Sequence, residues 1–213
     1  MAKNSNSELL GLIKQEYPEA KCELNFENNY QLIVAVILSA QCTDKRVNQI
    51  TPKLFAKYPT VESLAKADIS QLQEIIMPCG FFNNKSKNLI SMAQDVSTKF
   101  AGEIPNNKQQ LVSLAGVGEK TANVVLATAF KVPAIAVDTH VFRVSNRLGL
   151  ANATTVSKTQ KQLETRVNKA DWINLHHALV LHGRYVCKAI NPQCEKCKFA
   201  QHCKFFVKKS KNK

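Results

Sequence analysis

The chain is organised around residues 114–140, which read LAGVGEKTANVVLATAFKVPAIAVDTH. Gly116 and Gly118 flank Val117 in this stretch, and glycine lets a backbone turn sharply and come close to another molecule. The residues on either side of the turn have a helix-forming composition, so we predict a helix–hairpin–helix unit over about 107–131, with helices near 106–113 and 119–130. The backbone amides at the start of the second helix, together with the helix dipole, would bind an anion such as a phosphate.

Two charged residues in this stretch each have a structural and a functional interpretation. Lys120 falls in the first turn of the second helix, where a cation opposes the helix dipole at a cost of about 0.3–1 kcal/mol. Such departures from local rules concentrate at functional sites, although most lysines on helices are solvated surface charges. Asp138 stands before a run of helical apolar spacing that ends at Gly149, so it can be a helix N-cap without any catalytic role.

Charge and composition limit the class of protein. The 213 residues include 29 basic and 16 acidic side chains, and the net charge of +13 favours a polyanionic partner. Nucleic acid, a membrane surface and the ribosome would all suit this charge. The longest apolar run, residues 32–38, is far shorter than the ~20 residues that span a bilayer, and residues 1–7 do not lead into a signal peptide. We therefore expect a cytoplasmic protein without a membrane partner.

The apolar spacing is helical along the chain, which predicts an all-α fold. No stretch alternates with a period of two over a convincing length, and no two-residue turn joins β-rich runs. Lys85 and Lys87 near the start of one helix are expected to contribute to a phosphate track, and Pro52 is expected to kink or divide another. Outside the central unit, helices are predicted at residues 7–17, 30–40, 44–58, 60–66, 68–77, 84–100, 154–168 and 170–186, with a further one ending at Gly149.

Four of the seven cysteines lie within 17 residues. Cys187, Cys194, Cys197 and Cys203 are separated by six, two and five residues. Inside a cell, clustered thiols are more often metal ligands than disulfides. Four thiolates suit a tetrahedral zinc ion and also an iron–sulfur cluster, and the spacing alone does not separate these two possibilities.

Two motifs resemble the endonuclease III family of DNA glycosylases. The first is residues 114–122 followed by Val137-Asp138-Thr139-His140, and the second is the spacing of the four cysteines. Shorter matches at 38–44, 142–147 and 181–184 extend the resemblance over nearly the whole chain. Two positions depart from the family pattern: Ala115 stands where the family usually has proline, and Phe81 stands where it usually has leucine. The first bears on how the chain enters the hairpin, and the second on how a duplex would be wedged open.

The resemblance implies two helical lobes with the active cleft between them. One lobe would span residues 23–133 and contain the helix–hairpin–helix. The other would combine residues 1–22 with residues 134–213 and carry the cluster loop at 187–203. The resemblance also implies that one [4Fe–4S] cluster, rather than zinc, is bound by Cys187, Cys194, Cys197 and Cys203.

The implied function is that of a bifunctional DNA glycosylase and AP lyase of base excision repair. Such an enzyme removes oxidised pyrimidines from double-stranded DNA through a lysine Schiff base and cleaves 3′ to the abasic site by β-elimination. Lys120 would be the nucleophile and Asp138 its partner. The protein would act as a monomer, associated with the nucleoid if it is bacterial.

The resemblance also implies a set of DNA contacts. Gln41 would fill the gap left by a flipped nucleotide, although it can also be a polar helix terminus. Phe81, or the adjacent Phe82, would wedge the duplex, although adjacent aromatic residues are usually partly buried anchors. With the phosphate contacts expected from the hairpin amides and from the charge of the cysteine loop, the full expected set is Gly116, Val117, Gly118, Gln41, Phe81, Lys196 and Lys198.

Two alternative functions remain open. The first is a monofunctional adenine glycosylase of the same superfamily, but those relatives lack a lysine at the position of Lys120 and carry an extra C-terminal domain for which this chain has no room. The second is a non-catalytic helix–hairpin–helix DNA-binding module with a structural metal. The presence of both Lys120 and Asp138 argues against the second alternative.

Overall fold

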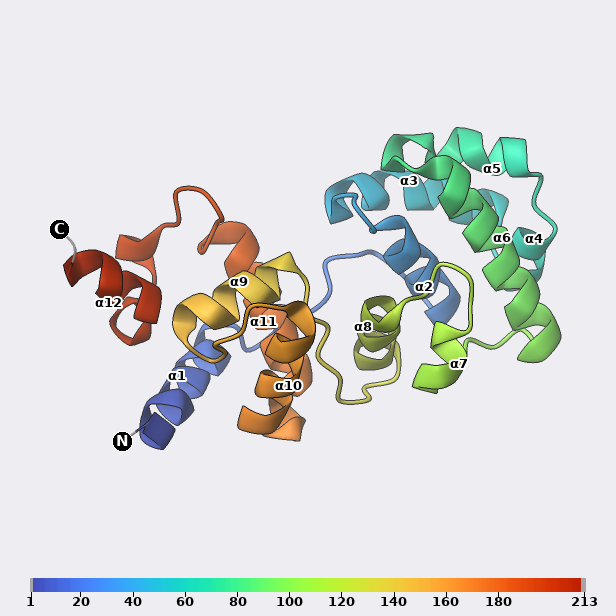
Figure 1. The fold of residues 1–213 in the computed structure, drawn as a ribbon. Coiled ribbons are helices and arrows are strands. Elements are labelled where there is room, and N and C mark those ends of the chain that lie inside the picture. The colour runs from blue at the N-terminus through green and yellow to red at the C-terminus, as the bar shows by residue number, and fades with distance from the viewer. Residues whose placement is uncertain (1, 212–213) are drawn as a thin grey trace. The chain divides into compact units, whose positions relative to one another are not determined.

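The protein is helical throughout the part of the chain that the structure describes. This computed structural model describes residues 2–211, which form the α-helices α1–α12 and four short 3-10 helices, η1–η4, and contain no strand (Figure 1). The predicted all-α fold is therefore confirmed. None of the described helices is both long enough and apolar enough to span a bilayer.

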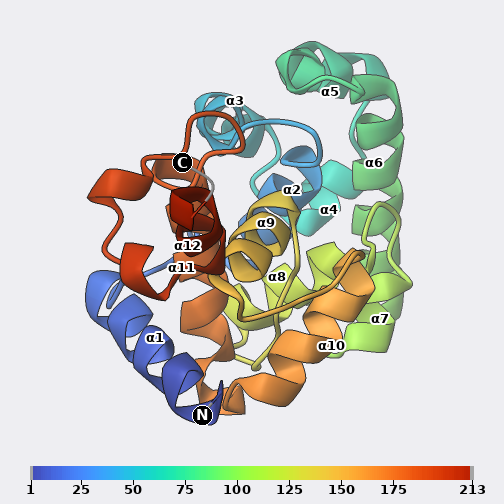
Figure 2. The same cartoon turned by 60° about the vertical axis from the view of Figure 1, so that its left-hand side comes forward.

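The chain divides into two compact units. One unit is Glu23–Val132, here called the continuous unit, and the other joins Met1–Cys22 to Pro133–Lys213, here called the split unit. The turned view in Figure 2 brings α1 and α12, the first and last helices of the split unit, towards the viewer. The split unit therefore uses residues from both ends of the sequence.

The continuous unit is built around α2. Eight of the ten residues of α2 are buried, and α2 contacts α3, α6 and α8. A helix that is apolar on all sides is expected inside a core. The bounds are α2 Asn29–Leu38, α3 Asp44–Lys57, α4 Val61–Ala65, α5 Ile69–Ile76, η1 Met77–Cys79, α6 Phe82–Lys99, α7 Lys108–Val112 and α8 Glu119–Ala129.

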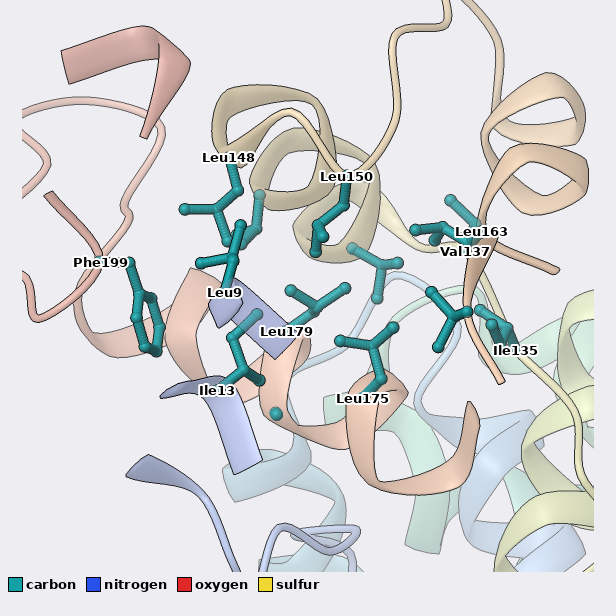
Figure 3. Packing of buried hydrophobic residues seen from close by; sticks show 14 of the residues in the cluster. Leu9, Ile13, Ile135, Val137, Leu148, Leu150, Leu163, Leu175, Leu179 and Phe199 are labelled. Carbon is teal, nitrogen blue, oxygen red and sulfur yellow. The ribbon is translucent and has the colours of Figure 1, made fainter. Parts of the chain in front are cut away.

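The core of the split unit joins the first helix to the last third of the chain. Leu9 and Ile13 of α1 meet Leu179 of α11 and Phe199 of the cysteine-bearing segment (Figure 3), and each of these four residues is at most 2% exposed. Burial of such side chains is the main source of stability in a helical core. The bounds are α1 Ala2–Glu16, α9 Thr139–Leu148, α10 Val156–Arg166, η2 Lys169–Asp171, α11 Trp172–Tyr185, η3 Cys194–Lys196, η4 Ala200–His202 and α12 Lys204–Lys211.

Two local predictions were wrong. The first helix begins at Ala2 instead of at residue 7, and α6 begins at Phe82, so only Phe81 remains in the turn before it. The helix predicted over residues 44–58 is confirmed as α3, and Pro52 lies inside it without dividing it. A proline inside a helix costs about 3 kcal/mol, but α3 buries the residues Val47, Ile50, Thr51 and Leu54, and this packing holds the helix together.

Candidate functional site

The predicted hairpin lies between α7 and α8. Gly116 has a φ angle of +78°, and a Cβ atom at this position would lie only 3.0 Å from Cβ of Asn88, so both the conformation and the space favour glycine. Val117 is 4% exposed and anchors the turn in the core. Its N–H donates to the carbonyl oxygen of Leu114 at 3.1 Å.

The start of α8 is open to a ligand. Gly118 is the N-cap of α8 and offers no side chain to cap it. A Cβ atom on Gly118 would meet no described atom within 4 Å outside its chain neighbours. Because the first backbone amides of a helix have no partner within the helix, this arrangement suits an anion.

Lys120 is the second residue of α8, and its side chain is exposed. The preceding residue, Glu119, pairs with Lys108 of α7, whose Nζ lies 2.5 Å from Glu119 Oε2. The acidic residue favoured by the helix dipole at this position is thus already engaged with another lysine, while Lys120 extends into solvent.

Asp138 is the N-cap of α9. The backbone N–H of Val141 donates to Oδ1 of Asp138 at 2.7 Å, which confirms the structural interpretation of this aspartate. The residue is only half-buried. A cap bond of this kind uses one carboxylate oxygen, whereas an ionised carboxylate has two that accept hydrogen bonds.

Gln41 and Phe81 share an unusual backbone conformation. Their φ angles are +54° and +50°, in the left-handed region that costs a non-glycine residue about 1–3 kcal/mol, and Ala101, Lys131 and Asn191 share this region. Both side chains are exposed, that of Phe81 to 63%. Phe82, in contrast, is half-buried at the start of α6, so Phe81 is the aromatic residue presented to solvent.

The four clustered cysteines line one pocket of the split unit. Among the described residues, no three His, Cys, Asp or Glu side chains are placed to bind a single metal ion. Four thiols around one pocket suit either a tetrahedral zinc ion or a [4Fe–4S] cluster. The lining of this pocket is Leu148, His182, Val186, Cys187, Pro192, Gln193, Cys194, Cys197, Ala200, Cys203, Phe205 and Phe206.

Two arginines of α9 hold the cysteine segment in place. Arg143 donates from Nε to the carbonyl oxygen of Cys187 at 3.0 Å and from Nη2 to that of Gly183 at 2.8 Å. Arg147 donates from Nη1 to the carbonyl oxygen of Lys188 at 2.8 Å and lies 3.5 Å from Sγ of Cys187. These bonds fix the backbone on both sides of Cys187. The match at 142–147 included both arginines, but the sequence analysis gave them no role. Their spacing of four residues, which places them on one face of a helix, is the signal that could have shown that they act together.

His182 and Phe199 connect the cysteines to the core. His182 Nε2 lies 3.5 Å from Cys197 Sγ, and His182 Nδ1 lies 2.9 Å from the hydroxyl of Tyr17. Burial lowers the pKa of His182 to about 4, so the ring is neutral at neutral pH. Burial also raises the pKa of the Cys197 and Cys203 thiols, so a metal that bound there would release their protons. The ring of Phe199 lies 4.8 Å from that of His182.

The basic residues expected to meet phosphates differ in their surroundings. Lys87 and Lys196 are exposed. Lys198 is exposed too, but its Nζ pairs with Glu16 Oε2 of α1 at 2.6 Å. Lys85 is only 5% exposed, and its ammonium donates to two backbone carbonyl groups. The prediction that Lys85 belongs to a phosphate track is therefore wrong.

Comparison with known proteins identifies the family. A family model described as HhH-GPD superfamily base excision DNA repair protein matches residues 34–169, which include the hairpin, Lys120 and Asp138. Within that superfamily, the chain belongs to the endonuclease III family. It is 44% identical over 202 residues to Endonuclease III of Synechocystis sp. (strain ATCC 27184 / PCC 6803 / Kazusa), covering 94% of this chain and 92% of the relative. It is also 44% identical over 203 residues to Endonuclease III of Bacillus subtilis (strain 168), covering 95% and 93%.

Two solved structures of relatives contain DNA. One is a non-covalent endonuclease III–DNA complex, and the other is a trapped endonuclease III–DNA covalent intermediate, an estranged-adenine complex. Each is 40% identical to this chain with a TM-score of 0.93, and the match covers 99% of both chains. The fold predicted from the sequence resemblance is thus confirmed.

Proposed function

We propose that the protein is a bifunctional DNA glycosylase and AP lyase of base excision repair, which removes oxidised pyrimidines from double-stranded DNA. The observation that carries this proposal is the exposed amine of Lys120 at the open, amide-rich start of α8. A relative that is 40% identical forms a covalent intermediate with DNA, which supports a nucleophilic mechanism. The protein would act as a monomer on cytoplasmic DNA, associated with the nucleoid if it is bacterial.

Binding precedes chemistry in this proposal. The amides after Gly118 hold a backbone phosphate, and the damaged nucleotide leaves the base stack at a cost of a few kcal/mol. Phe81 enters the stack as an apolar wedge, and Gln41 occupies the gap. The exposure of Gln41 and Phe81 supports these two roles.

Lys120 then carries the covalent step. Its neutral amine forms a bond from Nζ to C1′ of the sugar, the bond between C1′ and the base breaks, and the base leaves with a proton. Opening of the sugar ring gives an imine between Nζ and C1′. Removal of a proton from C2′ sends an electron pair towards the imine, and the bond from C3′ to the phosphate oxygen breaks. Asp138 supports the developing positive charge and assists the proton transfers.

The function is tested by incubating the wild-type protein with a duplex that contains one oxidised pyrimidine, in the presence of borohydride. An imine is reduced to a stable amine, so we expect a protein–DNA adduct, together with strand cleavage when borohydride is omitted. The absence of an adduct on every damaged duplex would favour the alternative function, a DNA-binding module without chemistry.

We further propose that Cys187, Cys194, Cys197 and Cys203 bind one [4Fe–4S] cluster. When bound, the cluster supplies metal–thiolate bonds that fold the segment into a compact loop. Arg147, which lies 3.5 Å from Sγ of Cys187, and the apolar wall of the pocket support this ligand set. No redox role is needed for the proposed reaction.

Purified protein is expected to be brown and to contain about four iron and four sulfide ions per chain. Elemental analysis of protein prepared without oxygen measures this content directly. A matched control is Cys22→Ser, which lies outside the pocket and should leave the iron content unchanged, whereas Cys194→Ser should lower it. Stoichiometric zinc without iron would show that the cluster assignment is wrong.

Lys196 is expected to contact a phosphate from the cysteine segment. Because each phosphate contact releases counterions, Lys196→Ala should weaken binding to all duplex sequences alike and reduce the salt slope by about one. Lys198→Ala should have a smaller effect, since its ammonium already pairs with Glu16. Equilibrium titrations at several salt concentrations measure these slopes. The control variant is Lys14→Ala, since Lys14 pairs with Asp171. If neither Lys196→Ala nor Lys198→Ala changes the salt slope, the cysteine segment does not contact DNA.

A further inference from the structure

Lys85 is a buried lysine whose charge faces neutral groups. The residue is 5% exposed, and its Nζ donates to the carbonyl oxygens of Leu38 at 2.9 Å and Cys79 at 3.0 Å. The nearby thiols of Cys42 and Cys79 hydrogen-bond to each other, and burial and this neighbour raise the pKa of Cys79 to about 12, so that thiol is uncharged. Burying a cation without an anionic partner is unfavourable, and burial accordingly lowers the pKa of Lys85.

The two carbonyl groups stand just before the two turns that carry the proposed DNA contacts. Leu38 is the last residue of α2, and Gln41 follows three residues later. Cys79 is the last residue of η1, and Phe81 follows two residues later. The backbone N–H of Lys85 also donates to the carbonyl oxygen of Phe81 at 3.0 Å. A single residue therefore bonds to the beginning of both turns.

We propose that Lys85 is a positioning residue, which fixes Gln41 and Phe81 relative to each other so that both enter an opened duplex in register. This inference rests on the proposed glycosylase function. Carbonyl groups at a helix end need a donor, and a cation is favourable there. Because Gln41 and Phe81 both have strained, left-handed backbones, each turn would relax and turn its side chain away if the anchor were lost.

The decisive variant is Lys85→Met, which keeps the apolar stem and removes the donors to Leu38 and Cys79. We expect base removal from a fully paired damaged duplex to slow by about tenfold at saturating enzyme, since small misplacements of positioning groups have effects of this size or larger. Affinity for undamaged duplex should stay within about twofold, because the phosphate contacts are unchanged. Lys85→Arg keeps a cation and donors in place, so it should recover part of the rate.

A positioning role can be separated from a general loss of structure by changing the substrate. When the damaged pyrimidine is unpaired in a bulge, no base pair has to be opened, so the loss caused by Lys85→Met should shrink to less than about twofold. The fluorescence of a 2-aminopurine base beside the lesion increases when the damaged base pair opens. This increase should be slower with Lys85→Met than with the wild type. An equal loss on paired and bulged substrates would overturn the proposal. If Lys85→Met does not fold, Lys85→Arg undergoes the same comparison.

A double-mutant cycle tests whether Lys85 acts through Gln41. In a Gln41→Ala background, Lys85→Met should cost clearly less than tenfold, because the part of its effect that acts through Gln41 is already lost and residues that act together are not additive. A full tenfold loss in that background would show that the two residues act independently. The control variant is Lys99→Met on the same helix, an exposed lysine paired with Asp95, which should behave as wild type. An inactive wild type would reject the proposed function itself, whereas an active wild type with additive losses would reject only the role of Lys85.

Discussion

Lys120→Ala is expected to abolish the adduct that borohydride traps between the protein and damaged DNA. Alanine has no amine, so no imine can form at this position. Alanine is also the best helix former, and the hairpin amides do not change, so folding and DNA binding should persist. Gel analysis of borohydride-treated mixtures measures the adduct, and a binding titration on the same duplex measures the affinity.

Two further variants sharpen this test. Lys120→Arg keeps the positive charge, but a guanidinium remains protonated and forms no imine, so this variant should bind DNA and give no adduct. Lys45 is the second residue of α3, preceded by an acidic residue as Lys120 is, and it is exposed, so Lys45→Ala should still give the adduct. An adduct at wild-type yield from Lys120→Ala would mean that another amine is the nucleophile.

Asp138→Asn is expected to slow turnover by ~10²–10⁴, the usual range for lost proton-transfer assistance. Asparagine caps a helix about as well as aspartate does, so the bond from the N–H of Val141 can be retained. Stability and DNA affinity should therefore stay close to those of the wild type. Single-turnover rates of base release, together with thermal unfolding, measure both quantities.

The cap and the charge of Asp138 can be tested independently. Asp138→Ala removes both, so it should also lower the free energy of unfolding by about 0.5–2 kcal/mol. Asp68 caps α5 in the same way, accepting from the N–H of Gln71 at 2.9 Å, and Asp68→Asn should leave turnover unchanged. If Asp138→Asn keeps the wild-type rate, the aspartate is only a cap.

The features that the sequence predicted well are encoded locally. The turn at Gly116 follows from glycine's freedom at positive φ, and the cap at Asp138 follows from its place three residues before Val141. The four cysteines fall within one short segment, so their meeting in one pocket requires little long-range information. The resemblance supplied the chemistry, because local patterns left Lys120 with two interpretations.

The features that the sequence did not predict depend on distant partners. Lys85 near the start of an amphipathic helix is typical of a surface charge, and its burial depends on the carbonyl of Leu38, 47 residues away. Arg143 likewise bonds to Cys187, 44 residues away.

The split unit has a consequence for how the protein is made. Helix α1 leaves the ribosome before the other described helices, yet Tyr17, which directly follows it, bonds to His182, which is 165 residues further along the chain. At about 5–20 residues per second, α1 waits roughly ten to thirty seconds for α11. During that time residues 23–132 can fold as a unit, while Leu9 and Ile13 expose an apolar helix face that a chaperone can cover. The proposed cluster would form later still, since Cys203 is synthesised after every described helix except α12.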